Sequence, residues 1–305
     1  MKKPVQYRLE YFGLRLLEGL VRLLPEGLLE PLGTRLARLF FYRFGYRRKA
    51  SMENLAIAFP EKSESEREAM AFASTRHFVM IALDYLKMGG WSSGKLLERT
   101  ELSNPERDRP FLEGRDGDPV IFITGHFGSW EVAAARVAAS FSGVSNAVLK
   151  RQRNPLVDAH IVRMRRRWRL EPMYADGAVR KGIRALRAGE WIGLVNDQDG
   201  GRRGIFVPFF GKMASTMVGG AALHLKTGAP LVFMAALRMG TLRYRIVLER
   251  VTVPPLQGDT AERMRIVTAA FTEVLERWVR QYPEQYLWMH RRWRTPYRPG
   301  DTSGG

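Results

Sequence analysis

The sequence predicts an α/β fold, a mostly parallel mixed sheet covered by helices, with an N-terminal amphipathic helical region. Between about residues 119 and 253, short apolar runs of strand length alternate with helical patterns, which is typical of strand–helix–strand units. The 305 residues are 45% hydrophobic, enough for one large domain with a full core. The first 45 residues instead show apolar side chains at helical spacing, edged with arginine.

Residues 1–60 form the first predicted unit, a set of short amphipathic helices. The first helix has an apolar face and three arginines spaced seven apart: Leu9, Phe12, Leu16, Leu20 and Leu23, with Arg8, Arg15 and Arg22. A second helix repeats the pattern after a turn: Leu32, Leu36, Leu39, Phe40 and Phe44, with Arg35, Arg38 and Arg43. Such helices lie in a membrane interface or pack on the rest of the fold. A spanning helix is not predicted, because no run of about 18 uncharged apolar residues occurs.

Residues 61–298 form the second predicted unit. A capping box at residues 63–66 opens a helix that runs to about Lys87. Strands are expected at residues 120–124, 144–149, 191–195, 231–237 and 244–253. Helices are expected at residues 131–140, 155–168, 179–188, 216–226 and 262–281. Residues 299–305 are expected to be a disordered tail.

Composition restricts the chemistry. The chain has no cysteine, which excludes disulfides, thiolate catalysis and cysteine-based zinc sites. Its five histidines show no metal-ligand spacing, so we predict neither a metal nor a cofactor. The formal net charge of +18 indicates an anionic partner, either nucleic acid, an anionic membrane or an acidic protein, unless it reflects only an arginine-rich surface. Because no nucleic-acid-binding signature occurs, we expect no nucleic-acid partner.

The most informative motif is Gly125-His-Phe-Gly-Ser-Trp-Glu131, between a predicted strand and a predicted helix. We interpret His126 and Glu131 as a catalytic dyad, in which the carboxylate orients the imidazole and the imidazole takes a proton from a hydroxyl. Backbone N–H groups of Gly128 and Ser129 are predicted to stabilise an oxyanion. The glycines would let a substrate approach the backbone. The alternative is a structural His–Glu pair, with Glu131 merely stabilising the start of a helix.

A second block, residues 196–204, follows another predicted strand, so it should lie at the same edge of the sheet. Asp197 and Asp199 are candidates for orienting an arginine or binding substrate hydroxyls. Arg202 and Arg203 are candidate phosphate ligands. The alternative is an ordinary solvated turn.

A third block contains Arg151 and Arg153, which are further candidate phosphate ligands, and Asn154, which fits an ordinary helix N-cap before Pro155. The arginine-rich stretch at residues 163–169 can face an acidic carrier protein, lipid phosphates or only solvent. The aromatic strip at residues 206–210 can line an acyl groove or pack in the core.

Seven ordered blocks together resemble the late, lauroyl/myristoyl acyltransferases of lipid A biosynthesis, within the lysophospholipid acyltransferase-like superfamily. The resemblance covers nearly the whole chain. Besides the histidine motif, the blocks are Asn54-Leu-Ala-Ile-Ala-Phe-Pro60, Arg153-Asn-Pro-Leu-Val-Asp158, Asp197-Gln-Asp-Gly-Gly201, Gly204-Ile-Phe-Val-Pro-Phe-Phe-Gly211, Thr227-Gly-Ala-Pro-Leu-Val232 and Pro283-Glu-Gln-Tyr-Leu-Trp-Met-His-Arg-Arg-Trp293.

The resemblance implies acyl transfer from a thioester, acyl-acyl carrier protein or acyl-CoA, to a hydroxyl of a lipid A precursor. It also implies a peripheral or monotopic location on the cytoplasmic face of the bacterial inner membrane. No covalent acyl-enzyme is expected, because a thioester is already activated. Two alternatives remain: another acceptor, such as phosphatidylinositol mannoside, or a non-catalytic basic protein that binds membranes or nucleic acid. One departure is an arginine missing near Asp176, for which Arg180 can substitute.

Overall fold

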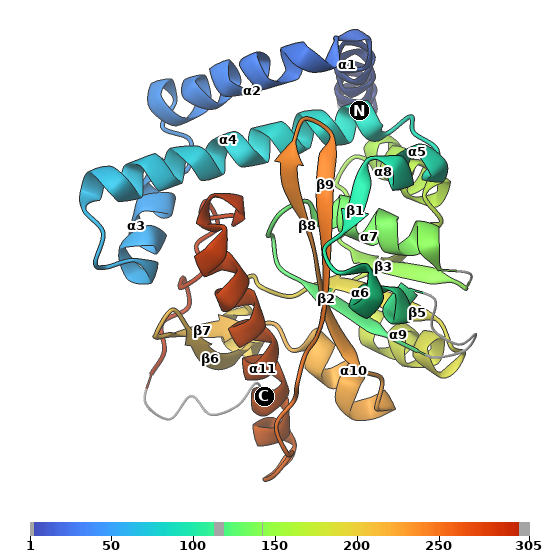
Figure 1. Ribbon diagram of the computed structural model, residues 1–305, viewed down its shortest axis with the longest axis vertical. Coiled ribbons are helices and arrows are strands. Elements are labelled where there is room, and N and C mark those ends of the chain that lie inside the picture. The colour runs from blue at the N-terminus through green and yellow to red at the C-terminus, as the bar shows by residue number, and fades with distance from the viewer. Residues whose placement is uncertain (1–2, 113–118, 142, 299–305) are drawn as a thin grey trace.

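The computed structural model describes residues 3–112, 119–141 and 143–298 (Figure 1). The predicted tail at residues 299–305 lies outside the described residues. The helices are α1 Lys3–Leu23, α2 Leu29–Arg38, α3 Arg48–Ala58, α4 Glu64–Met88, α5 Ser93–Glu98, α6 Pro105–Leu112, α7 Trp130–Ser140, α8 Pro155–Arg167, α9 Ala178–Arg187, α10 Gly219–Thr227 and α11 Thr260–Gln281. The strands are β1 Thr100–Leu102, β2 Ile121–Thr124, β3 Ser145–Leu149, β4 Leu170–Tyr174, β5 Trp191–Val195, β6 Ile205–Phe209, β7 Lys212–Thr216, β8 Leu231–Gly240 and β9 Arg243–Arg250.

The main sheet has seven strands in the order β1-β9-β8-β2-β5-β3-β4. Every pairing in it is parallel except the β8–β9 hairpin. A separate antiparallel pair, β6 and β7, lies beside α11 (Figure 1). The predicted fold class, a mostly parallel sheet covered by helices, is therefore confirmed.

Both faces of the sheet are buried, as a mostly parallel sheet requires. Along β2, Ile121 and Ile123 face a core shared with α9, α10 and α11, whereas Phe122 faces a second core shared with α7 and α8. This alternation follows the two-residue period of a strand. It explains why the strand patterns in the sequence are continuous apolar runs.

Local signals predicted the helix starts well. Ser63 caps α4 in a complete capping box with Glu66, and the Asn154 side chain accepts the N–H of Leu156 at the start of α8. The sequence prediction missed β1, β4 and the β6–β7 hairpin. In β4, Pro172 interrupts the apolar pattern and only Leu170 and Met173 are buried, so the strand has no period-2 signature.

Helix α1 is amphipathic, but its predicted apolar face points outward. Leu9, Phe12 and Leu16 are 67%, 66% and 54% exposed, whereas Glu18 and Val21 are buried against the rest of the fold. Within the described residues, no helix is long and apolar enough to cross a membrane. The outward apolar face favours the interfacial interpretation of this helix over simple packing.

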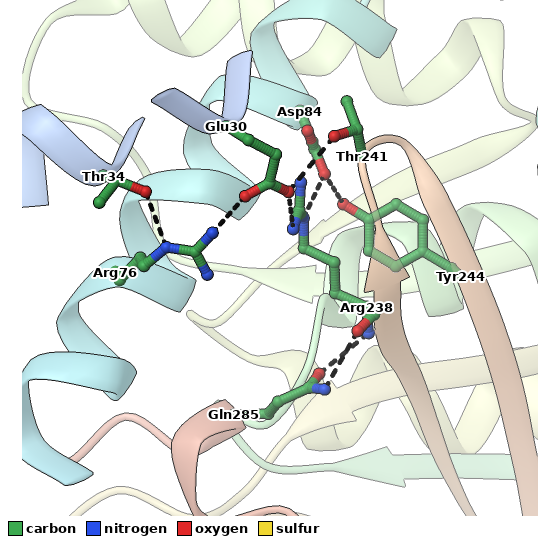
Figure 2. A network of polar contacts seen from close by, with 8 residues as sticks. All are labelled: Glu30, Thr34, Arg76, Asp84, Arg238, Thr241, Tyr244 and Gln285. Carbon is green, nitrogen blue, oxygen red and sulfur yellow. Dashed lines mark hydrogen bonds and ion pairs between the residues drawn. The ribbon is translucent and has the colours of Figure 1, made fainter. Parts of the chain in front are cut away.

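Helix α2 is connected to the sheet by a partly buried ionic network (Figure 2). Arg238 of β8 donates to Asp84 of α4 at 2.7 Å and to Glu30 of α2 at 2.8 Å. The Tyr244 hydroxyl donates to the same Asp84 oxygen at 2.6 Å. Figure 1 shows α4 crossing the end of the sheet where β8 turns into β9.

A domain boundary near residue 60 stays a prediction.

Candidate active site

His126 lies where the sequence places it, just past the carboxyl end of β2 and before α7. Strand β5 is the parallel neighbour of β2, with Thr124 opposite Val195, so the loop after β5 lies beside the histidine. Ligands of open α/β sheets bind outside the carboxyl ends of the strands. The His126 side chain is 20% exposed, which leaves part of it accessible.

Asp197, from the loop after β5, is the carboxylate that binds His126. Its Oδ1 lies 2.8 Å from the imidazole Nδ1, and its Oδ2 accepts the backbone N–H of His126 at 2.9 Å. With an ionised Asp197, Nδ1 carries the proton and Nε2 keeps the lone pair. The side-chain nitrogen of Gln198 lies 3.3 Å from Nε2, and the Trp130 ring meets the imidazole edge-on. The structure therefore holds the imidazole in one orientation, with Nε2 available as a base.

Opposing forces set the protonation of this pair. Burial disfavours the imidazolium, but the Asp197 charge and hydrogen bond outweigh it, with help from the Glu131 charge, and raise the pKa of His126 above 6.5. Burial likewise works against an ionised Asp197, but His126 and the charge of Arg292 hold the pKa of Asp197 below its usual range. A neighbouring carboxylate thus makes the imidazole a stronger base.

The predicted direct contact between His126 and Glu131 is corrected by the structure. The Glu131 carboxylate forms a bidentate ion pair with Arg165 of α8. Arg165 Nε donates to Glu131 Oε2 at 3.0 Å, and Arg165 Nη2 donates to Glu131 Oε1. Glu131 sits in the first turn of α7, from where its side chain reaches α8. Its charge still acts on the imidazole through space. The orienting role assigned to Glu131 belongs to Asp197, whereas a role in catalysis stays a prediction.

The predicted oxyanion donors are also occupied within the protein. The N–H of Gly128 donates to the Gln285 carbonyl at 2.9 Å, and the N–H of Ser129 donates to the Ala236 carbonyl at 2.8 Å. Gly128 has a φ of +58°, and a Cβ there would lie 2.3 Å from the Ala236 oxygen. This glycine therefore serves close packing of the loop on β8 rather than approach of a substrate.

The C-terminal segment that follows α11 closes over the histidine loop. The N–H of Leu287 donates to the His126 carbonyl at 3.0 Å, and Tyr286 pairs with Phe127 in an isolated β-bridge. The Asn54 side chain donates to the Trp288 carbonyl at 2.7 Å. The sequence blocks at residues 54–60 and 283–293, for which no role was predicted, therefore position the histidine loop. No local pattern could reveal this, because 234 residues separate Asn54 from Trp288.

The other predicted site residues are spread along the same edge of the sheet. Asp199 holds the C-terminal segment, accepting bonds from the Arg294 guanidinium and the Thr295 hydroxyl at 3.2 and 3.0 Å. Arg151 stacks on the Tyr174 ring, 3.8 Å from its centroid. The remaining predicted arginines have exposed side chains: Arg153, Arg180, Arg202 and Arg203.

The aromatic strip at residues 206–210 belongs to the core. Phe206, Val207, Phe209 and Phe210 are all buried, and the Phe209 ring stacks on Trp293. The packing interpretation of this strip is the one that the structure favours. In the described part of the chain, no group of three or more histidine and acidic side chains could hold a metal ion.

Comparison with known proteins identifies the family of this chain. The family model "Bacterial lipid A biosynthesis acyltransferase" matches residues 2–295. The lipid A biosynthesis lauroyltransferase of Escherichia coli K12 is 28% identical over 297 residues, covering 95% of this chain and 92% of that protein. The myristoyltransferase of the same pathway and organism is 24% identical, covering 95% and 88% of the two chains. The chain therefore belongs to the bacterial lipid A biosynthesis acyltransferase family.

Proposed function

We propose that this protein transfers a fatty acyl chain from an acyl thioester on acyl carrier protein to a hydroxyl of a lipid A precursor. Membership of the family supports acyl transfer in lipid A biosynthesis. The observation that carries the mechanism is the His126–Asp197 pair, held at 2.8 Å between two parallel strand ends. The net charge of +18 favours an acidic carrier protein as the source of the thioester.

In the proposed mechanism, His126 Nε2 removes the proton of the acceptor hydroxyl as the oxygen attacks the thioester carbonyl. Asp197 holds the proton on Nδ1 and stabilises the imidazolium that forms. The tetrahedral intermediate then expels the carrier thiolate, which takes the proton from the imidazolium. The amide of Gln198, 3.3 Å from Nε2, is placed to donate to the oxyanion, as glutamine side chains can.

Direct assay tests this function. Purified protein incubated with labelled acyl-acyl carrier protein and a lipid A precursor should yield a product heavier by one acyl chain, detected by mass spectrometry. Transfer to phosphatidylinositol mannoside and not to the lipid A precursor would support acyl transfer by this protein but assign it a different acceptor. Absence of transfer to either lipid, with a folded protein, would contradict the proposal.

Glu131 is proposed to support the imidazolium by its charge, at a distance. We expect Glu131→Gln to lower turnover by about ten- to a hundredfold, corresponding to roughly 1.4–2.8 kcal/mol of transition-state stabilisation, with little change in KM. Turnover is measured as steady-state acyl transfer, and the melting temperature of the same variant is measured by thermal unfolding.

The matched comparison for Glu131 is Arg165→Gln, which breaks the same ion pair from the other side. If both variants and their double mutant lose turnover equally, Glu131 acts through Arg165 and not on His126. A lowered melting temperature with normal turnover in Glu131→Gln would reduce its role to helix stability.

We further propose that the protein binds the cytoplasmic face of the inner membrane through the apolar face of α1. Phe12 and Leu16 are more than half exposed, and burying such side chains contributes about 1.5–3 kcal/mol each. The arginines beside this face suit anionic lipids.

Replacing Phe12 and Leu16 together with glutamate should move the protein from the membrane to the soluble fraction on centrifugation. Substitution is sharper than deleting residues 1–45, because deletion would also remove Leu29 and Phe41, which are fully buried in the core. Leu256→Glu, at another exposed apolar residue, is the control and should stay membrane-bound. A double variant that remains fully membrane-bound would show that another surface anchors the protein.

A further inference from the structure

A cavity of about 280 Å³ lies between α1 and α8, and the proposed mechanism does not use it. Arg15 and Arg22 line it from α1, and Arg163 and Arg167 line it from α8. His160 of α8 also lines it. The space is several times the roughly 30 Å³ that a water molecule occupies in the liquid, so a small anionic group with its hydration can enter.

A buried carboxylate holds part of this wall in place. Glu18 is 2% exposed; it accepts from Arg15 Nη1 at 2.7 Å and also pairs with Arg22. His160 Nε2 lies 3.1 Å from the same carboxylate. The Arg167 guanidinium is fixed by the Gly89 carbonyl at 2.6 Å. Arg15, Arg22 and Arg167 are therefore preorganised before any ligand arrives, which reduces the entropy lost on binding.

The charge of the cavity is strongly unbalanced. Its walls hold four guanidinium groups, and Glu18 supplies one negative charge against them. Burial and the neighbouring arginines outweigh Glu18 and lower the pKa of His160, so the ring adds no charge at neutral pH. Each guanidinium has five donors. Arg15 and Arg167 each use one donor in the contacts described above, and Arg22 uses two, one to Glu18 and one to the Leu86 carbonyl. Donors therefore remain for an anion.

The cavity lies to one side of the outward apolar face of α1, toward α8. Tyr11 and Arg15 line the cavity, whereas Phe12, Leu16 and Leu20 are exposed. A helix with its side chains is about 10–12 Å across, and an interfacial helix sinks about 5–10 Å into the boundary of headgroups and acyl chains. The cavity would then lie near the level of the lipid phosphates.

We propose that this cavity binds a phosphate group carried by a membrane lipid. Arginine pairs with phosphate through two parallel N–H donors, and guanidinium groups on two helices can grip one phosphate from both sides. Helix α8 also carries Arg165, which pairs with Glu131 of the histidine motif, so the helix that lines the cavity also contacts that motif. The site rests on the membrane location proposed above and not on acyl transfer itself.

Vesicle binding is the first test. The double variant Arg163→Gln with Arg167→Gln should bind vesicles of phosphatidylcholine and phosphatidylglycerol about tenfold more weakly than wild type, because it removes charged donors to the lipid phosphate. A tenfold loss corresponds to about 1.4 kcal/mol of binding free energy. Binding to phosphatidylcholine alone should change less. Arg15→Gln removes a guanidinium from the other wall and decides the result if the double variant fails to fold. Arg166→Gln, which replaces an exposed arginine of α8 paired with Glu171, is the matched control.

The second arm identifies the source of the phosphate. KM is measured for a phosphorylated glycolipid acceptor and for the same acceptor treated with phosphatase. If the acceptor's own phosphate binds, the variants raise KM about tenfold for the intact acceptor and leave it unchanged for the treated one. If the variants bind vesicles more weakly but keep the wild-type KM for both acceptors, the cavity binds the anionic lipids of the membrane and not the acceptor.

Unchanged results in both arms would overturn the proposal, as would a change confined to the KM for acyl carrier protein. The vesicle arm requires no catalysis, so its failure is distinguishable from failure of the proposed acyl transfer.

Discussion

Replacing His126 with alanine is expected to lower turnover by about two to four orders of magnitude, the usual contribution of a general base. The reason is geometric. Nδ1 is bound to Asp197 at 2.8 Å, which leaves Nε2 as the atom that can accept the hydroxyl proton. The measurement is steady-state transfer from labelled acyl-acyl carrier protein.

Circular dichroism and thermal melting of His126→Ala supply the folding control. His224→Ala is the matched control, because its ring bonds the Ala229 carbonyl at 2.8 Å and has no part in the proposed chemistry. A folded His126→Ala protein with wild-type turnover would remove this residue from the mechanism.

Asp197→Asn is expected to lower turnover by roughly three to four orders of magnitude, although the side chain keeps its shape. An amide can present its N–H to Nδ1, which favours the tautomer with the proton on Nε2, and it cannot stabilise an imidazolium. The loss should exceed that of Glu131→Gln, because Asp197 contacts the ring whereas Glu131 pairs with Arg165.

Asp259→Asn is the comparison for Asp197→Asn, since Asp259 caps α11 at an exposed position and should leave turnover intact. If Asp197→Asn kept near-normal turnover while Glu131→Gln lost most of its turnover, Glu131 and not Asp197 would be the residue that orients His126.

The sequence predicted the position of His126 correctly because the signals are local. An apolar strand, a glycine-flanked loop and an alanine-rich helix follow one another within about twenty residues. The same locality misled the prediction of its partner. Glu131 is near in sequence, but the first turn of α7 faces α8, where Arg165 lies 34 residues further on.

The true partner could not be read from spacing, because 71 residues separate Asp197 from His126. Their contact depends on β5 lying beside β2 in the sheet. Strand order is a property of tertiary packing, and periodicity carries no information on it. The sequence had identified Asp197 only as a candidate for orienting an arginine or binding substrate hydroxyls, because it lies in a polar loop that follows an apolar strand.

The oxyanion prediction was corrected for a similar reason. Gly128 and Ser129 precede a helix, where free N–H groups are common, but Gln285 and Ala236 supply carbonyls from distant parts of the chain. By contrast, the apolar face of α1 was predictable, since helical spacing alone determines which residues share a face. That this face points outward came only from the structure.

The most direct test of this account is the pH dependence of kcat/KM in wild type and Asp197→Asn. The active form needs a neutral imidazole, so the rate is lost as pH falls through the pKa of His126. Because Asp197 raises that pKa above 6.5 against the effect of burial, the acid limb of wild type should lie above pH 6.5. In Asp197→Asn, burial is opposed mainly by the more distant Glu131, and the limb should shift to lower pH. An acid limb at the same pH in both proteins would contradict the claim that the His126–Asp197 pair is the catalytic base.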